Sequence, residues 1–414
     1  MKKVTSLLKS VRIMTDKKRL FSIFLIVFID LLGFSVILPL LPFYAETFGA
    51  NATTVGFLVA IYAAGQMFSA PILGRLSDRY GRRPFLIISI FGGAISFFML
   101  GFANNLTMLF LARLTAGLTA GNISVAQAYI TDITDDKSRA RGLGLIGAAF
   151  GLGFIIGPAM GGILSQWGYS VPAFLAAGIA TLNLLIVFLW LPESLTVERK
   201  NEILLQKKPP ISINSVIATL KKPIVGPLLN TRIFYGFAFA LFQSVFALYG
   251  QYRFGLNAQN IGYILTYVGI ISVVTQGFLV GKISDRFPDH KIILVSTTII
   301  AFSFLAWAFA PNRIFLLIIL LPIAMNAGIL NTIINSALTK AVPPIEFGGI
   351  LGLSASLESA TRVIAPSLGG FLLERFGTSA PGLLAGIILL WLSTYVFRLI
   401  FSPQKVASVN PAKI

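Results

Sequence analysis

The sequence of 414 residues contains no cysteine, a single histidine and only 15 acidic residues. Without cysteine, disulfide frameworks, thiolate catalysis and cysteine-ligated metals are excluded. The histidine, His290, stands in a charged loop, so we predict no metal site and no histidine-based catalysis. Charged residues make up 12% of the chain, against roughly 25% in soluble globular domains. These shortages exclude a soluble enzyme and a disulfide-stapled secreted domain.

Hydrophobic residues make up 56% of the chain and occur in long runs. A helix needs about 20 mainly apolar residues to cross about 30 Å of hydrocarbon. We therefore predict an all-α membrane protein with twelve transmembrane helices in two pseudo-symmetric six-helix bundles. The predicted spans are 20–42, 54–74, 84–103, 106–129, 142–163, 171–191, 223–249, 260–281, 291–310, 314–339, 348–372 and 381–401.

One long polar stretch interrupts the apolar runs, at residues 192–222. It divides the chain into a six-helix half at 1–191, a cytoplasmic linker at 192–222 and a second half at 223–414. We predict these as the domains.

The net charge of +18 could indicate a nucleic-acid partner. Here, however, the basic residues stand at the ends of apolar runs: 27 of the 33 fall on one predicted side of the membrane and three on the other. The positive-inside rule then places both termini in the cytoplasm, in a cell inner membrane. We predict the lipid bilayer as a partner and no nucleic acid.

The chain contains an internal repeat. Gly74-Arg-Leu-Ser-Asp78-Arg79 and Gly281-Lys-Ile-Ser-Asp285-Arg286 match at an offset of 207 residues. Gly157-Pro158 and Ala365-Pro366 begin a second matching pair, offset by 208. Nearly equal offsets indicate duplicated halves, a layout in which transporters place their substrate site near the midplane.

Three motifs resemble the major facilitator superfamily, and within it the twelve-span drug:proton antiporter branch that includes tetracycline exporters. They are the loop motif from Gly74 to Arg83, Arg113 with Gly117 and Gly121 in span 4, and a glycine–proline run in span 5. The resemblance implies a proton-coupled exporter of small amphipathic compounds that works by alternating access. It also implies a monomer whose partners are a small-molecule substrate and protons, with no cofactor and no enzymatic activity.

The loop motif is the predicted gate, and its residues are Gly74, Asp78, Arg79, Gly81, Arg82 and Arg83. Gly74 and Gly81 permit a tight turn and close helix approach, and Asp78 can cap a helix. The resemblance implies that Asp78 meets the start of span 11 and that Arg82 pairs with Asp132, which latches the outward-open state. The alternative is that these are only positive-inside charges. In the second-half copy Pro288 replaces the glycine and Asp289-His290 replace the arginines, so its gating role is doubtful.

Small residues recur in span 5 at spacings that let helices pack closely. This predicted packing motif comprises Gly147, Gly151, Gly157, Pro158, Gly161 and Gly162. Pro158 removes a backbone donor and bends the helix. We expect a bent seam against the other half; the alternative is ordinary small-residue packing.

Charged residues inside spans indicate function, because a central charge costs at least about 2.5–3.5 kcal/mol. Asp30 and Glu358 lie near mid-depth, and Arg362 follows Glu358 by one helical turn. We predict Asp30 as the main protonation site, tuned by Arg113, and Glu358 as a second candidate held by Arg362. The alternative for Glu358 and Arg362 is a static ion pair.

Polar and aromatic residues in spans 4, 7 and 10 are candidates for the substrate cavity. Together with Asp30 they are Gln127, Gln243, Phe246, Asn331 and Asn335. A largely apolar pocket with few polar groups suits an amphipathic ligand. In a chain with 35 phenylalanines, an aromatic stripe can equally be ordinary packing.

Other functions compete with drug export. The main rival is a proton-coupled transporter of a specific metabolite, siderophore, lipid or sugar, by export or by symport import. The span 5 glycine–proline run favours export. The charges retained in mid-membrane argue against a receptor or scaffold.

Overall fold

The computed structural model describes residues 2–134, 136–195, 213–343 and 347–401. Within these ranges the regular structure is helical throughout, with no β-strand. The predicted all-α class is confirmed.

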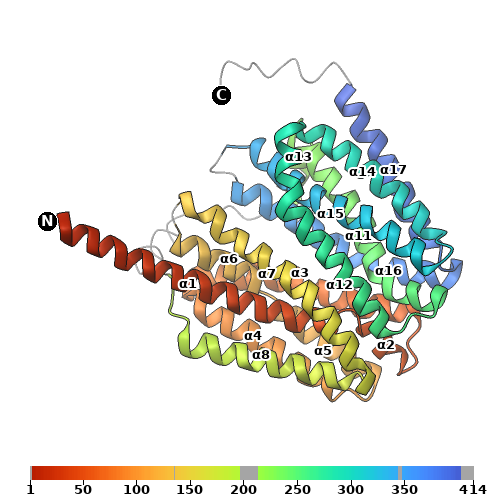
Figure 1. Ribbon diagram of the computed structural model, residues 1–414, viewed down its shortest axis with the longest axis horizontal. Helices are drawn as coiled ribbons and strands as arrows, with labels where there is room; N and C mark the ends of the chain where they lie inside the picture. The colour runs from red at the N-terminus through yellow and green to blue at the C-terminus, as the bar shows by residue number, and fades with distance from the viewer. Residues whose placement is uncertain (1, 135, 196–212, 344–346, 402–414) are drawn as a thin grey trace. The chain divides into compact units, whose positions relative to one another are not determined.

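The first sequence half forms eight α-helices, coloured red to yellow-green in Figure 1. They are α1 (Lys2–Ile37), α2 (Leu41–Glu46), α3 (Ala52–Tyr80), α4 (Arg82–Gly101), α5 (Leu106–Leu118), α6 (Asn122–Ile133), α7 (Asp136–Leu164) and α8 (Ser170–Trp190). A short 3₁₀ turn, η1 (Ser165–Trp167), follows α7. Each of the first six predicted spans corresponds to one of these helices or, for span 4, to a pair.

The second half forms the helices coloured green to blue in Figure 1. They are α10 (Ile213–Leu220), α11 (Val225–Phe254), α12 (Ala258–Val274), α13 (Val280–Arg286), α14 (Asp289–Ala308), α15 (Arg313–Lys340), α16 (Phe347–Phe376) and α17 (Ala380–Phe401). The helix α10 lies in the predicted linker, whose residues 196–212 are outside the described residues.

Eleven stretches of the described chain are long and apolar enough to cross a membrane. The twelfth predicted span coincides with α16, which has 30 residues and is therefore long enough. This helix is not one of those eleven stretches, and it carries Glu358 and Arg362 in its middle.

Span 4 is a broken helix, which the apolar run did not reveal. The helix α5 ends at Leu118 and α6 begins at Asn122. Around the break a glycine backbone lies close to α3: a Cβ on Gly117 would overlap the backbone of Tyr62, and one on Gly121 would meet the Leu73 side chain at 2.7 Å. Tight packing on α3 therefore accompanies the break.

Span 8 contains a π-helical turn, η2 (Thr275–Leu279), between α12 and α13. A π turn accommodates one extra residue within an otherwise regular helix. The matching first-half helix, α3, runs without such a turn.

The chain separates into two compact units. Unit 1 comprises residues 1–51, 57–208 and 256–270, and unit 2 comprises 52–56, 209–255 and 271–414. Each unit is thus one sequence half plus a short segment of the other. The division predicted at 192–222 stays a prediction, although the boundary at 208/209 falls within it.

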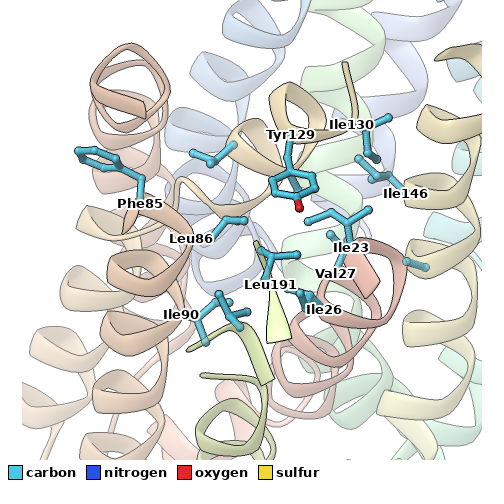
Figure 2. Packing of buried hydrophobic residues seen from close by; sticks show 14 of the residues in the cluster. Ile23, Ile26, Val27, Phe85, Leu86, Ile90, Tyr129, Ile130, Ile146 and Leu191 are labelled. Carbon is cyan, nitrogen blue, oxygen red and sulfur yellow. The ribbon is translucent and has the colours of Figure 1, made fainter. Parts of the chain in front are cut away.

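A hydrophobic core fills unit 1 between α1, α4, α6 and α7. Figure 2 shows Ile23, Ile26 and Val27 of α1 facing Leu86 and Ile90 of α4. Tyr129 of α6 is fully buried in this cluster, and its hydroxyl donates to the carbonyl of Pro192 at 2.9 Å. The core therefore also fixes the chain that follows α8.

An aromatic cluster forms the equivalent core in unit 2. Phe242 stacks on Phe304 with ring centroids 5.0 Å apart and meets Trp307 edge-on at 4.8 Å. Phe246 packs on Phe242 and is only 3% exposed. The packing alternative for the aromatic stripe describes these residues, and Phe246 lies in this core; its predicted cavity role stays a prediction.

The span 5 motif makes two different contacts within unit 1. On one side, a Cβ on Gly157 or Gly161 would overlap Ser35 or Val36 of α1. On the other, Gly162 lies against α12, where its added Cβ would be 3.0 Å from the Cα of Gln259. The predicted seam against the second sequence half is thus formed by only part of the motif.

Pro158 belongs to this seam as well, because its carbonyl oxygen leaves no room for a Cβ on Gly262 of α12. Gly147 does not: it is exposed, and a Cβ there would meet nothing within 4 Å. Its predicted packing role is wrong for this structure, since the helix face it occupies has no neighbour. Gly151 is half-buried.

Unit 2 contains the repeat-related contacts. Its segment 52–56 lies against α16, where a Cβ on Gly370 would overlap the Ala52 carbonyl and one on Gly56 would overlap that of Pro366. The Thr53 hydroxyl also donates to the Glu374 carboxylate at 2.5 Å. The glycine seam therefore occurs twice, once in each unit.

Candidate functional site

Asp30 lies about four-fifths of the way along α1. Asn122, the first residue of α6, donates a hydrogen bond from its amide to the Asp30 carboxylate. The helix break in span 4 is what places Asn122 at this position. Ile26, Val27, Leu86 and Ile90 line a cavity of about 10 Å³ beside the two polar groups, room for about one water molecule. These four side chains belong to the core in Figure 2, so Asp30 borders apolar walls.

No cationic side chain pairs with Asp30 among the described residues. The predicted tuning partner, Arg113, is 2% exposed, and its guanidinium lies over the ring of Tyr62 at 4.3 Å. A second ring, Phe34, is 5.9 Å away. A desolvated cation–π contact is worth about 2 kcal/mol or more, so Arg113 is held by aromatic rings. Arg113 makes no hydrogen bond or ion pair with Asp30 in this structure, and its predicted tuning of Asp30 stays a prediction.

Glu358 of α16 accepts hydrogen bonds from two guanidiniums. One comes from Arg362, one turn later, at 2.8 Å, as the spacing predicts. The other comes from Arg232 of α11, which also donates to the side-chain oxygen of Asn331 on α15 at 2.6 Å. Three helices of unit 2 thus meet through one set of polar side chains, which we call the basic cluster: Arg232, Asn331, Glu358 and Arg362.

Sequence reasoning missed Asn122 and Arg232 as site residues. Both carried a signal: Asn122 follows Gly121 of the span 4 motif, and Arg232 is a charge near the start of span 7. Neither signal identifies a partner, because the partner depends on how the helices are rotated in the bundle.

The remaining cavity candidates are scattered. Gln127 on α6, Gln243 on α11 and Asn331 on α15 are exposed, whereas Asn335 is half-buried. The structure joins only Asn331 to a charged side chain, and the cavity role of the others stays a prediction.

At the predicted gate, Arg82 connects the ends of three helices. Its Nε donates to Asp132 at the end of α6 at 2.9 Å, and its Nη1 donates to Asp78 at 2.6 Å. The side chains of Arg82 and Asp132 are only 4% and 5% exposed. The predicted pairing with Asp132 is confirmed, while its gating role stays a prediction. The start of span 11, the predicted partner of Asp78, adjoins residues 344–346, which lie outside the described residues.

Glu193 caps α4, although the sequence analysis had considered Asp78 as the capping acid of the loop motif. Its carboxylate accepts from the backbone N–H groups of Arg82 at 2.8 Å and Arg83 at 3.1 Å. Gly81 has a φ of 114°, and a Cβ there would lie 2.5 Å from the Glu193 carboxylate. Ser194 adds a bond from its hydroxyl to Asp132 at 3.0 Å. The segment after α8 is therefore bound to the loop motif.

The other loop residues differ from expectation in one respect. Gly74 lies inside α3, and a Cβ there would meet nothing within 4 Å, so its predicted role in a turn or close approach is wrong. Arg79 is exposed beside Tyr80. Arg83 donates to the carbonyl of Phe188 on α8 at 2.5 Å.

The second-half copy of the loop carries an ion pair of its own. Lys340, at the end of α15, is 2.8 Å from Asp289, the first residue of α14. Their side chains are 62% and 19% exposed, so this pair is much more accessible than Arg82–Asp132. Among the described residues, no group of three acidic or histidine side chains could hold a metal ion.

Known proteins match this chain over most of its length. The family model described as Major Facilitator Superfamily matches residues 23–366 and 231–413. The tetracycline resistance protein of class H from Pasteurella multocida is 31% identical over 361 residues, 86% of this chain and 89% of the relative. Multidrug resistance protein 2 of Bacillus subtilis is 28% identical over 389 residues, 91% and 94% of the two chains.

The fold is also that of a solved transporter. A bacterial homolog of the human lysosomal transporter Spinster, in an inward-facing and occupied conformation, superposes with a TM-score of 0.76 at 16% identity. The match covers 92% of this chain and 96% of that one. At this identity the likeness shows the fold alone.

Proposed function

Because the chain belongs to the Major Facilitator Superfamily and its relatives lie in the drug:proton antiporter branch, we propose that it exports small amphipathic compounds in exchange for protons. The observation that carries the proposal is the setting of Asp30. Its carboxylate borders apolar side chains and has a neutral amide, Asn122, as its polar partner. A carboxylate without a cationic partner is the group in a span that gains most from binding a proton.

Through its bond with Asn122, protonation of Asp30 can change the contact between two helices. The amide joins α1 to the first residue of α6 and can accept or donate as the state of Asp30 requires. A proton on Asp30 replaces a charge–amide contact with a neutral one, which is weaker. Protonation therefore loosens a contact between α1 and α6 at the break in span 4.

The contacts of Arg82 supply the proposed latch for alternating access. Arg82 joins α3 and α4 to α6 through two carboxylates, and Glu193 and Ser194 attach the chain after α8 to the same site. A side chain with this many charge-assisted bonds holds these helix ends as one body. The proposal assigns to Asp78, which also accepts from Arg82, the contact with the start of span 11 that forms in one state and breaks in the other.

The proposed location is a bacterial-type inner membrane with both termini in the cytoplasm. The bias of basic residues toward the predicted cytoplasmic loops supports this orientation. The proposal takes the protein as a monomer made of two six-helix halves.

Asp30→Asn tests proton coupling directly. Wild-type protein in an efflux-deficient bacterial host should confer resistance to tetracycline or to other members of an amphipathic drug panel. In everted vesicles, export of the same drug should follow an imposed proton gradient. Asp30→Asn should abolish the gradient dependence, because an amide cannot carry the proton.

Glu46→Gln is the matched control, since it neutralises an acid at the end of the short helix α2. It should behave as wild type. Unchanged gradient dependence in Asp30→Asn would overturn the assignment of Asp30, and unchanged drug susceptibility across the panel would overturn drug export.

A further inference from the structure

The helix α16 has a polar, exposed face in the middle of its length. Gly352 and Ser356 lie one turn apart, Ala355 and Arg362 lie about two turns apart, and all four are exposed. The Arg362 side chain is 55% exposed. Hydrocarbon cannot solvate a guanidinium. This face therefore borders water or a polar ligand, and not lipid.

The basic cluster carries an excess positive charge. It contains two guanidiniums, of Arg232 and Arg362, and one carboxylate, of Glu358. Asn331, the fourth member, is neutral. One positive charge near mid-membrane is thus left without a counter-charge from the described residues, although a buried charge is normally paired.

A second observation points to a missing acceptor. Arg232 is only 7% exposed, and its Nε is buried with no hydrogen-bond partner. An unsatisfied buried donor costs about 1–3 kcal/mol. Retaining such a donor beside an exposed arginine is consistent with a site that a ligand completes.

Aromatic side chains extend the cluster along α11. Tyr235 and Phe239 follow Arg232 at one-turn intervals, with ring centroids 5.8 Å apart. Phe239 is half-buried. An apolar surface next to a cationic group matches a molecule that has an apolar body and an anionic end.

We propose that the basic cluster binds the anionic group of the transported compound. Arg362 makes the accessible contact, and Arg232 supplies the charge behind it. Guanidiniums suit this role because their fixed fork of donors matches carboxylate, sulfonate and phosphate oxygens. Glu358 orients both arginines and lowers the net charge to one, so that binding stays reversible.

The inference rests on the proposed transport function, because it names the class of compound carried. It separates the tasks of the two carboxylates in the spans. Asp30, without a cation, carries the proton; Glu358, between two cations, positions arginines for the substrate.

Equilibrium binding of two dyes tests the proposal without any proton gradient. Fluorescein and rhodamine 6G share a xanthene body but carry opposite charges. Fluorescence polarisation on the purified full-length protein in detergent should show tighter binding of fluorescein. Arg362→Gln should weaken fluorescein binding by about tenfold, the value of one charge-assisted hydrogen bond, and leave rhodamine 6G binding unchanged or stronger.

Arg375→Gln is the matched control, because it removes an exposed arginine from the last turn of the same helix. It should leave both affinities unchanged. The anion site would be overturned if Arg362→Gln weakened the binding of both dyes equally, or if Arg375→Gln weakened fluorescein binding as much as Arg362→Gln does. It would also be overturned if the wild type preferred rhodamine 6G or bound neither dye.

Glu358→Gln supplies a test of sign. Removing the only carboxylate of the cluster raises its net charge, so fluorescein should bind several-fold more tightly. A weaker affinity in a variant that still folds, judged by its elution as a single species, would show that Glu358 acts in another way. Because these measurements need no gradient, they can fail while the Asp30→Asn result holds, or the reverse.

Discussion

The two sequence halves place charges of opposite sign in the same framework. In the first half Asn122, on the fourth span, bonds Asp30 on the first span. In the second half Asn331, on the fourth span, bonds Arg232 on the first. The two asparagines are separated by 209 residues and their charged partners by 202, so the two contacts join corresponding spans without occupying equivalent positions of the repeat. If both proposals hold, the halves divide the work: the first binds the proton and the second binds the anion.

The loop motif and its second-half copy also carry charges of opposite sign at corresponding positions. Arg82 and Asp132 correspond to Asp289 and Lys340 at offsets of 207 and 208 residues, so the ion pair is retained with its charges reversed. The first pair is almost fully buried, whereas Lys340 is 62% exposed. Breaking a buried ion pair whose members are fully hydrogen-bonded costs more free energy than breaking an exposed pair. We therefore expect only the first pair to act as a strong latch.

The largest difference should come from breaking these two ion pairs. Arg82→Gln leaves two carboxylates without their cation and should lower the free energy of unfolding by about 3–5 kcal/mol. Lys340→Gln removes an exposed partner and should cost no more than about 1 kcal/mol. Denaturant titration of both variants in the same detergent gives the two values. Equal losses would contradict the proposed asymmetry of the halves.

Substitutions of the two bridging asparagines should affect different measurements. Asn122→Ala removes a hydrogen bond to a charged group, worth about 1.5–3 kcal/mol, and should lower gradient-driven export about tenfold with little effect on fluorescein affinity. Asn331→Ala should weaken fluorescein binding and leave gradient dependence intact. Vesicle transport and polarisation on both variants check this. If both variants lost both properties equally, the division of work would be refuted.

Gly81→Ala should destabilise the loop by about 1–3 kcal/mol, because it forces a left-handed backbone and a clash with Glu193. Gly74→Ala, in the same motif, should be neutral or slightly stabilising, since glycine is unfavourable inside a helix. Thermal unfolding of the two variants distinguishes them. A larger loss in Gly74→Ala would show that the close approach first expected there exists in another state.

Ser194→Ala should have the smallest effect. It removes one of two hydrogen bonds to the Asp132 carboxylate while Arg82 remains, and should cost about 1 kcal/mol. Among the described residues, no third side chain bonds to Asp289 or Lys340, so a matched Thr339→Ala should leave stability unchanged. Denaturation midpoints measured side by side provide the comparison.

Helix positions could be predicted from the sequence because hydrocarbon thickness dictates the length of an apolar run. The broken span 4 and the π turn of span 8 could not, since the polar residues at these places, such as Asn122 and Gln276, are isolated within long and mostly apolar runs. Arg82–Asp132 was predictable because the motif and its family resemblance name both members.

Side-chain partners that depend on how each helix is rotated in the bundle could not be predicted from the sequence. An arginine in span 4 and an acid in span 1 look complementary, yet Arg113 lies over Tyr62 and Asp30 bonds Asn122. Intrahelical spacing identified Arg362 beside Glu358, but Arg232 approaches from another helix. Glu193 was missed for a similar reason: it follows span 6 in sequence and caps α4 in space.

The π turn in span 8 also marks a difference in length between the duplicated halves. The helices α3 and α12 begin at Ala52 and Ala258, and the seam glycines Gly56 and Gly262 keep the same separation of 206 residues. Beyond η2, Gly74 and Gly281 are separated by 207. One residue was therefore gained or lost between these landmarks after the duplication, and the π turn is where the second copy holds the extra residue without disturbing the faces on either side.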